Sequence, residues 1–348
     1  MKEKVIISLS ITCALSLVTP YASAATDLYG CDNFYHFQSI KKLFEMELKK
    51  ADQQNPSPLK HINIEGKMPN NEIFKESEIS LKDMDTIQIA AISWASNIIP
   101  DKSLNIATKY ILSWVNTYTP TFNPVDEAKF SQLIRAYSII KKSISNQDND
   151  KIKKYLTAWG DGYIQRMSHN DNSSQWKSNW QSNRIRLVTL ISVATDDNDM
   201  YDKARQLYLT QLRQNIYIDG STWDFKERDS IKYVIADLDA LLDSALAARA
   251  KGDDWYNLVS SSGSSLSLAI NWLLPYANGE KKHIEFNKTS VKFDIQRANA
   301  HIEGFSGYFD PKISANLLWI ATIFDPSLIN TAKKLRASKP FYYTQCYK

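Results

Sequence analysis

Glycine and proline are both scarce in this sequence of 348 residues, which has only 10 glycines and 11 prolines. Architectures with many strands use both residue types at their turns, so the shortage argues against a β fold. The chain also lacks a strong excess of one charge, because 42 lysines and arginines stand against 38 aspartates and glutamates. A net charge of +4 does not indicate nucleic acid as a partner. Hydrophobic residues make up 43% of the chain, enough for a large globular core.

Several signatures of chemistry are missing from the sequence. It has no glycine-rich phosphate loop, no nucleophile elbow and no zinc signature, so we expect neither a cofactor nor a metal. The histidines show no metal-ligand spacing. His169 and His301, which both lie in irregular segments, are the two for which a catalytic role stays open. After the N-terminal segment, no apolar run reaches the ~20 residues of a membrane-spanning helix. We therefore expect no membrane contact in the mature protein.

The N-terminus has the pattern of a secretory signal. Lys2 and Lys4 precede an apolar run over 5–18, and the small residues Ala22-Ser-Ala24 follow it. This pattern predicts cleavage after Ala24 and a mature protein in the periplasm or outside the cell. A lipoprotein signal that uses Cys13 is the alternative, although the residues before this cysteine suit such a signal poorly.

Two cysteines remain once the signal segment is removed. Cys31 lies near the start of the mature chain and Cys346 near its end. An even pair in an oxidising compartment predicts a disulfide, which would pin the two ends of the chain together. Two unrelated thiols are the alternative. In the chain-entropy view, closing so long a loop would stabilise the fold by about 4–5 kcal/mol.

Helical periodicity runs through nearly the whole mature chain. Strand-like alternation is confined to 284–293, and no linker, composition shift or repeat divides the sequence. The pattern predicts one all-α domain over 25–348 with ten or more helices. Such helices can form a bundle, a superhelix or a closed α/α toroid, and periodicity does not choose among them. The expected helical segments are 37–48, 87–99, 106–115, 130–144, 152–167, 185–194, 204–212, 231–246, 266–274 and 313–323.

A polar, amide-rich loop with two tryptophans leads into a helix over 168–186. Aromatic rings stack on sugar rings while amides bind hydroxyl groups, so this composition suits a saccharide cleft. If the helix starts near Ser178, two amides and a guanidinium share one of its faces. A solvated helix face covered by a tryptophan lid is the alternative. The residues concerned are Trp176, Trp180, Asn179, Asn183 and Arg186.

A second candidate strip covers 219–233, where a turn that contains Trp223 feeds a helix. Tyr233 lies beside the apolar ridge of that helix. The cations around it would favour a tyrosinate and hold anionic groups. A purely structural tyrosine is the alternative. The neighbouring cations are Lys226, Arg228 and Lys232.

Three segments share a wider pattern. In 118–137, Pro-Thr-Phe-Asn-Pro precedes a helix that ends in Ala-Tyr. In 219–248, Asp-Gly-Ser is followed by Arg228, Asp-Ser-Ile and Tyr233, and 186–204 carries Val-Ala-Thr. Together these segments resemble the alginate lyase family, over roughly residues 85–330. The resemblance implies a periplasmic or secreted (α/α) toroid, an incomplete α/α barrel, that cleaves polyuronates by β-elimination without an essential metal.

The resemblance also implies site residues. Elimination needs groups that neutralise the uronate carboxylate, a base at C5 and an acid for the departing O4. Tyr233 matches the family tyrosine that serves as base and acid, and Arg228 matches its arginine. The family's Asn-Asn-His run reads Ser178-Asn179-Trp180 here, so the second asparagine is retained and the histidine is absent. Asn183 and His169 are the nearest substitutes.

These matches give each candidate a role. Asn179 and Arg228 would neutralise the carboxylate, and Asn183 and Arg186 would orient it. Lys232 would bind the substrate beside Tyr233. The tryptophans Trp176, Trp180 and Trp223 would stack on neighbouring sugars.

Two other functional classes stay open. A catalytically inactive protein that binds an acidic polysaccharide could use the same scaffold, and the absent histidine favours it. A hydrolase would need two carboxylates across the cleft. Asp224 and Glu227 lie on adjacent turns of one strip, which is poor geometry for flanking a bond.

Overall fold

A computed structural model describes residues 38–169 and 173–337. The expected signal segment and the cysteines Cys31 and Cys346 lie outside these residues, so signal cleavage and the disulfide remain predictions. Ten or more helices were expected, and the chain forms the following ones: α1 Gln38–Asp52, α2 Glu72–Ser80, α3 Lys82–Ala95, α4 Pro100–Thr117, α5 Ser131–Ile140, α6 Asn146–Ser168, α7 Asn179–Thr195, α8 Asn198–Asn215, α9 Trp223–Arg228, α10 Ile231–Arg249, α11 Leu266–Ala277, α12 Lys292–Asn299, α13 Ala315–Ala321 and α14 Ile329–Leu335.

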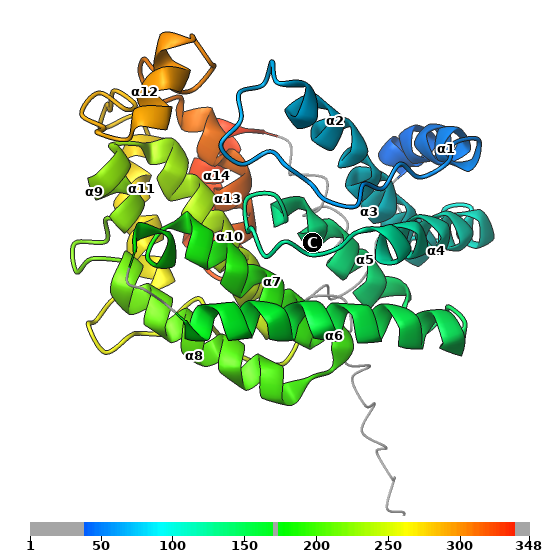
Figure 1. Ribbon diagram of the computed structural model, residues 1–348. Helices are drawn as coiled ribbons and strands as arrows, with labels where there is room; N and C mark the ends of the chain where they lie inside the picture. The colour runs from blue at the N-terminus through cyan, green and yellow to red at the C-terminus, as the bar shows by residue number, and fades with distance from the viewer. Residues whose placement is uncertain (1–37, 170–172, 338–348) are drawn as a thin grey trace, which may run out of the picture.

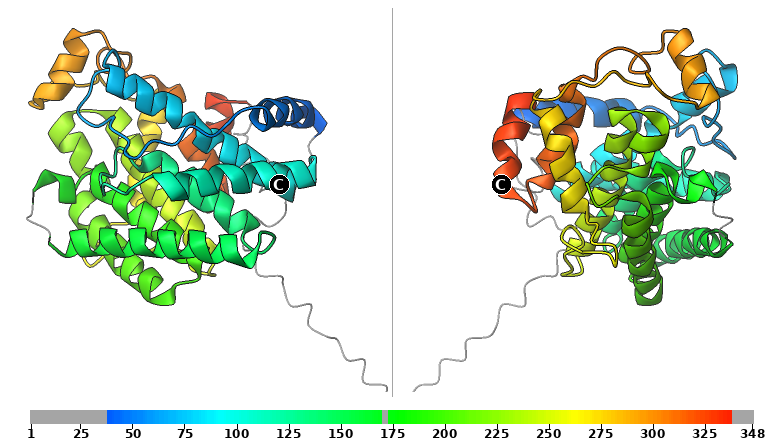
Figure 2. Two further views of the ribbon diagram at one scale, coloured as in Figure 1. Left: turned by 45° about the vertical axis from the view of Figure 1, so that its right-hand side comes forward. Right: turned by 90° about the vertical axis from the view of Figure 1, so that its left-hand side faces the viewer.

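The helices form an α/α toroid, as the family resemblance implied (Figure 1). Helices α3, α5, α7 and α10 pack side by side in this order, and α13 packs on α10. An outer layer covers them, with α4 on α3, α6 and α8 on α7, and α11 on α10 (Figure 2). Short 3-10 turns complete the fold: η1 Ala128–Phe130, η2 Ser174–Trp176, η3 Pro311–Ser314 and η4 Pro326–Leu328.

Burial follows from a helix's place in the toroid. The predicted ridge of α10 is fully buried, with Ile231, Val234 and Leu238 at 0% exposure. Helix α7 has α5, α6, α8 and α10 around it and is buried on nearly every side. Its sequence therefore shows little contrast between faces, because a helix enclosed all round has no solvent face to mark.

Two expectations about secondary structure were wrong. Residues 284–293 do not form a strand; Ile284 makes one isolated bridge to Tyr308, and α12 begins at Lys292. The segment 53–80, which lies outside the expected helical segments, contains α2. Its amphipathic pattern is weak, and its start is marked by the side chain of Asn71, which accepts hydrogen bonds from two amides of the first turn.

The loop before α5 is built around a buried carboxylate, Glu127, which is 0% exposed. This loop is part of the first family-like segment. Both oxygens of Glu127 accept several hydrogen bonds, so one residue fixes the path of the loop against α4 and α6. The donors are the hydroxyls of Tyr118 (2.8 Å), Thr121 (3.2 Å) and Tyr163, the amides of Thr121 (2.6 Å) and Phe122 (3.0 Å), and Nε1 of Trp159 (2.9 Å).

No helix in the described part of the chain combines the length and apolar character needed to cross a membrane.

Candidate functional site

The corner between α9 and α10 brings an arginine and a tyrosine into contact. Helix α9 ends at Arg228, Asp229 takes a left-handed conformation (φ 51°), and Ser230 caps α10 by accepting from the Tyr233 amide. The sharp reversal folds the Arg228 guanidinium over the Tyr233 ring, 3.7 Å from its centroid. The two residues that the family resemblance singled out are therefore in direct contact.

Helix α12 adds two residues that the sequence did not single out. The carboxylate of Asp294 is fully buried and accepts from Nε (2.8 Å) and Nη2 (2.9 Å) of Arg228. Nη1 of Arg297 donates to the Tyr233 hydroxyl at 3.0 Å. Figure 1 places α12 above the end where α9 and α10 meet. These partners lie more than 60 positions along the chain from Tyr233, so no local spacing could reveal them.

The environment of Tyr233 keeps its hydroxyl protonated. Burial raises the pKa of Tyr233 above its usual value, and the charge of Asp294 raises it further, while Arg228 and Arg297 act in the opposite direction. Arg228 thus favours the tyrosinate, as expected of a neighbouring cation, but burial outweighs it in the free protein. Lys226 instead lies 3.5 Å from Asp219.

Lys232 points toward the loop after α12. Its Nζ donates to the Glu303 carbonyl (3.3 Å) and lies 4.2 Å from the centroid of the Phe305 ring. The side chain therefore helps to hold the 300–305 segment over the site instead of contacting the Tyr233 hydroxyl.

Asn179 begins α7, whose cap is Ser178. Its amide N–H donates to Asp224 Oδ2 (2.7 Å) and its Nδ2 donates to Asp224 Oδ1 (2.6 Å). The residue is 6% exposed, so its amide anchors α7 to α9 and does not stand open to a substrate carboxylate. Asn183, half-buried one turn later, donates from Nδ2 to the Asn179 carbonyl (2.9 Å).

A buried polar network lies under Asn179. Burial raises the pKa of Asp224 to about 6, against the opposing effect of Asn179 and Arg228. Burial, and next the charge of Asp224, raise the pKa of Asp237 well above its usual value. Asp237 thus holds its proton the more tightly of the two carboxyl groups, because the charge of Asp224 opposes its ionisation. Because Asp224 is 0% exposed, it cannot serve the hydrolase alternative as a carboxylate at a sugar bond.

Replacing Asp237 by asparagine should stabilise the protein increasingly as pH rises. The folded state holds the Asp237 proton more tightly than the unfolded chain does, so the contribution of this group to stability falls as pH rises above about 4. An asparagine amide at this position does not ionise, so it makes no such contribution. Urea unfolding at pH 5 and pH 8 should show a larger gain at pH 8. Equal differences at both pH values would contradict the assignment, and the exposed Asp199→Asn is the control.

An open cavity of about 500 Å³ lies beside Arg228, between the starts of α7, α9 and α12. Trp180 and Trp223 both line it, as expected of rings that stack on sugars. The remaining lining is mostly polar, so the cavity offers apolar faces together with hydrogen-bonding groups. Its other residues are Ser173, Ser174, Gln175, Ser178, Glu227 and Val291.

Of the predicted residues, only Arg228, Trp180 and Trp223 line this cavity; Tyr233, Lys232, Asn179 and Asn183 are not among its lining residues, and the other three lie elsewhere. Trp176 is buried (8% exposed) under the Arg184 guanidinium, 4.1 Å from its ring, and therefore has a structural role. His169 is exposed at the end of α6, where Nδ1 contacts the Gln165 carbonyl at 2.8 Å. Arg186 lines a different cavity, two turns further along α7.

Among the described residues, no group of three or more His, Cys, Asp or Glu side chains is placed to hold a metal ion.

Comparisons with known proteins agree with this architecture. The alginate lyase family matches residues 38–283. An alginate lyase from Bacteroides ovatus is similar in structure, with a TM-score of 0.64 and 16% identity over 89% of this chain and 93% of that one. A histidine-to-alanine variant of alginate lyase A1-III complexed with tetrasaccharide has a TM-score of 0.61 and 14% identity, over 93% and 96% of the two chains.

Alginate lyase A1-III from Sphingomonas species A1 gives a TM-score of 0.55 at 15% identity, over 83% of this chain and 93% of that one. No curated protein matches the chain significantly. The structural similarities at this level of identity concern the fold, while the family match covers most of the sequence. This chain belongs to the alginate lyase family.

Proposed function

We propose that this protein is a polysaccharide lyase that cleaves an acidic, uronate-containing polysaccharide such as alginate by β-elimination. The observation that carries the proposal is the Tyr233 hydroxyl, held by Arg297 at 3.0 Å while Arg228 covers the tyrosine ring. The cavity next to Arg228 has two tryptophans for stacking on sugars. Family membership supports the same chemistry.

In this reaction the C5–H bond breaks, its electron pair forms the C4=C5 double bond, and the C4–O4 bond breaks. Tyr233, as tyrosinate, takes the proton from C5 and passes it to the departing O4, so it returns to its starting state. Arg228 and Arg297 stabilise the negative charge on Tyr233 and on the uronate carboxylate. Asn183, half-buried on the neighbouring helix, orients the sugar. Asn179 does not contact the sugar; it positions the site by fixing the start of α7.

The rate should rise with pH. Because the pKa of Tyr233 is raised above its usual value of about 10, only a small fraction is tyrosinate near neutrality. We expect kcat/KM to increase about tenfold per pH unit until this group ionises. A profile that is flat between pH 7 and pH 9 would contradict a base with this pKa.

The proposal is tested by incubating the purified protein with alginate, polyglucuronate and other acidic exopolysaccharides. The unsaturated product absorbs in the ultraviolet, which hydrolysis products do not. A rise in absorbance with any of these substrates is the expected result. Reducing ends that form without a double bond would instead indicate a hydrolase.

A catalytically inactive polysaccharide-binding protein is the second candidate. Two observations favour it: Trp180 occupies the position of the family histidine, and Asp294 already pairs with Arg228. Binding of an acidic polysaccharide without any product, measured by calorimetry and absorbance on the same sample, would decide for this candidate.

We further propose that the protein acts in the periplasm or outside the cell. The N-terminal pattern of Lys2, Lys4 and the apolar run over 5–18 supports export. N-terminal sequencing of the protein recovered from cells should begin at Ala25. A mature chain that still starts at Met1 would overturn this assignment.

A further inference from the structure

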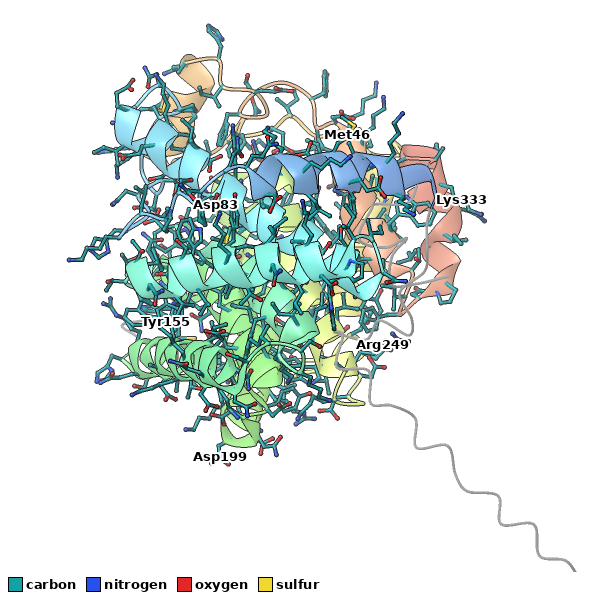
Figure 3. The ribbon with its side chains drawn as sticks, turned by 90° about the vertical axis from the view of Figure 1, so that its right-hand side faces the viewer. Met46, Asp83, Tyr155, Asp199, Arg249 and Lys333 are labelled. Carbon is teal, nitrogen blue, oxygen red and sulfur yellow. The ribbon has the colours of Figure 1, made fainter. Side chains whose placement is uncertain are left out.

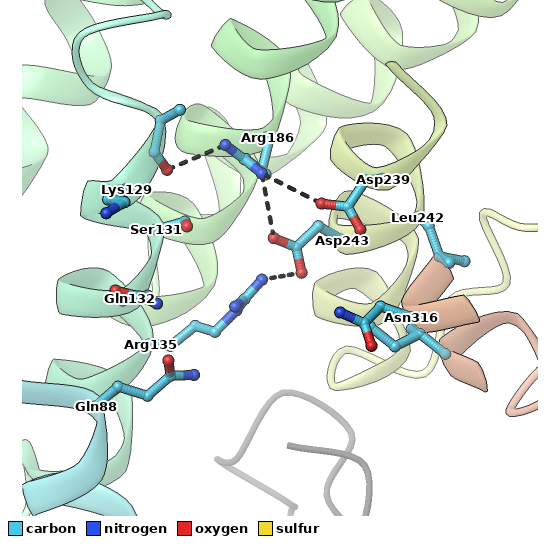
Figure 4. Close-up of a pocket in the computed structure, with 12 residues that line it drawn as sticks. Gln88, Lys129, Ser131, Gln132, Arg135, Arg186, Asp239, Leu242, Asp243 and Asn316 are labelled. Atoms are coloured by element: carbon cyan, nitrogen blue, oxygen red, sulfur yellow. Dashed lines mark hydrogen bonds and ion pairs between the residues drawn. The ribbon is translucent and has the colours of Figure 1, made fainter. Parts of the chain in front are cut away.

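A second cavity, of about 410 Å³, lies among the inner helices of the toroid (Figure 4). Side chains from α3, α5, α7, α10 and α13 line it, and most of them are polar. Its volume falls within the range of about 300–1,000 Å³ typical of small-molecule sites. The lining residues are Gln88, Ala128, Lys129, Ser131, Gln132, Arg135, Arg186, Asp239, Leu242, Asp243, Asn316 and Ile320.

The Arg186 guanidinium, 9% exposed, extends between two carboxylates of α10. Its Nη2 donates to the Ala128 carbonyl at 3.0 Å. Its Nη1 lies 3.9 Å from both Asp239 and Asp243, too far for a hydrogen bond, and its Nε is buried without a hydrogen-bond partner. The protein therefore leaves this buried cation incompletely hydrogen-bonded.

The cavity also offers hydrogen-bond acceptors. The Asp239 side chain is 48% exposed, so its carboxylate stands open to a ligand. Asp243 is held by Arg135 in a close ion pair. A ligand that bridges Arg186 and Asp239 must both accept and donate hydrogen bonds at neighbouring atoms. A sugar hydroxyl does both.

The charges of the cavity balance. Arg135 and Arg186 face Asp239 and Asp243, and Lys129 has its own partner in Glu78 at 4.0 Å. No excess positive charge remains to pair with the carboxylate of a uronate. Removing that carboxylate from water would therefore cost free energy that no ion pair in the cavity offsets. The site thus suits an uncharged sugar better than an acidic one.

This separate cavity lies further along α7 and α10 than the candidate active site. Helices α7 and α10 run in the same direction, because Ser182 contacts Asp237 and, further on, Arg186 contacts Asp243. Asp239 follows Tyr233 by six positions on α10, which is about 9 Å along the helix axis. Six positions also turn Asp239 by about 120° around the helix relative to Tyr233, so an oligosaccharide that contacts both residues would have to bend around α10.

We propose that this cavity binds a neutral sugar residue through the hydroxyl groups of its ring, with Arg186 and Asp239 as the principal contacts. The proposal rests on the proposed lyase function in one respect: it makes the substrate an acidic heteropolysaccharide, in which neutral sugars neighbour the uronate that is cleaved. Sugar binding in the cavity itself does not require activity.

Binding is tested first on the Tyr233→Phe protein, which keeps the cavity but should not turn over. Nuclear magnetic resonance titrations would compare methyl glycosides of glucose, galactose and mannose with those of glucuronate and mannuronate. We expect at least one neutral glycoside to bind more tightly than either uronate. Tighter binding of the uronates, or no binding of any neutral glycoside, overturns the proposal.

Two substitutions locate the binding. Asp239→Asn keeps the size of the side chain but loses a charged acceptor, and should weaken binding of the neutral glycoside by about tenfold. Asp199→Asn is the matched control, because this exposed aspartate lies at the far edge of the molecule (Figure 3). Equal affinity of both variants and the parent would place the sugar outside this cavity.

Activity on two polymers then separates this inference from the proposed function. Wild-type protein should cleave gellan, whose repeat joins glucuronate to neutral hexoses, faster than alginate, in which every sugar is a uronate. Cleavage of alginate but not of gellan would support the proposed lyase function and contradict the neutral-sugar site. Binding of the neutral glycoside without cleavage of any polymer would support the neutral-sugar site and contradict the proposed lyase function.

Discussion

Replacing Tyr233 with phenylalanine should lower the rate of lyase cleavage by at least about 100-fold, the lower end of what a positioned acid–base group contributes. The substitution removes only the hydroxyl that Arg297 holds. The ring would keep its place under Arg228 and its edge-on contact with Phe286, 5.7 Å away between centroids. The initial rate of ultraviolet absorbance change measures the effect, and circular dichroism checks that the fold is intact.

His169→Ala is the matched control for this experiment. This histidine is exposed at the end of α6, and its ring contacts only its own helix and Ser168 among the described residues, so we expect a rate close to that of wild type. If the control loses activity and Tyr233→Phe stays within a few fold of wild type, His169 and not Tyr233 has taken over the task of the family histidine.

Replacing Glu127 with alanine should lower the free energy of unfolding by about 3–5 kcal/mol. The side chain is fully buried and accepts hydrogen bonds from Tyr118, Trp159, Tyr163 and the loop amides. Each buried donor left without an acceptor costs about 1–3 kcal/mol, partly relieved where water enters the cavity. Urea unfolding followed by tryptophan fluorescence measures the change.

Two further variants sharpen this test. Glu127→Gln keeps the volume and one acceptor oxygen but places an amide N–H₂ against donors, so we expect a loss smaller than that of Glu127→Ala. Glu76→Ala, on an exposed position of α2, should change stability by less than about 0.5 kcal/mol. A Glu127→Ala loss no larger than that of Glu76→Ala would mean that the loop does not depend on this carboxylate.

The sequence alone determined the helical fold class and much of the core. The apolar ridge of α10 has helical spacing, and burial of Ile231, Val234 and Leu238 follows from it. The sequence also placed the start of α10 at residue 231 and allowed a start of α7 near Ser178; in the structure Ser178 and Ser230 are the N-cap residues, whose side chains accept from the first turn. Such features depend on neighbours within one or two turns, so local spacing contains them.

The choice of toroid came from family resemblance, because periodicity is the same for a helix in a bundle, a superhelix or a ring. The same resemblance singled out Arg228 and Tyr233, and the structure places the guanidinium of Arg228 over the Tyr233 ring. It also suggested Asn179 for the substrate carboxylate. The structure gives its amide to Asp224 instead, a residue 45 positions away.

Only the tertiary structure decided which residues meet at the candidate site. Asp294 and Arg297 reach Arg228 and Tyr233 because α12 folds back over the corner of α9 and α10, more than 60 positions along the chain. Arg186 shares a face of α7 with Asn179, yet packing of α10 directs it into a separate cavity with Asp239. A one-dimensional pattern records which side of a helix a residue is on. The partner on that side, and with it the charge and pKa of the site, is set by long-range packing.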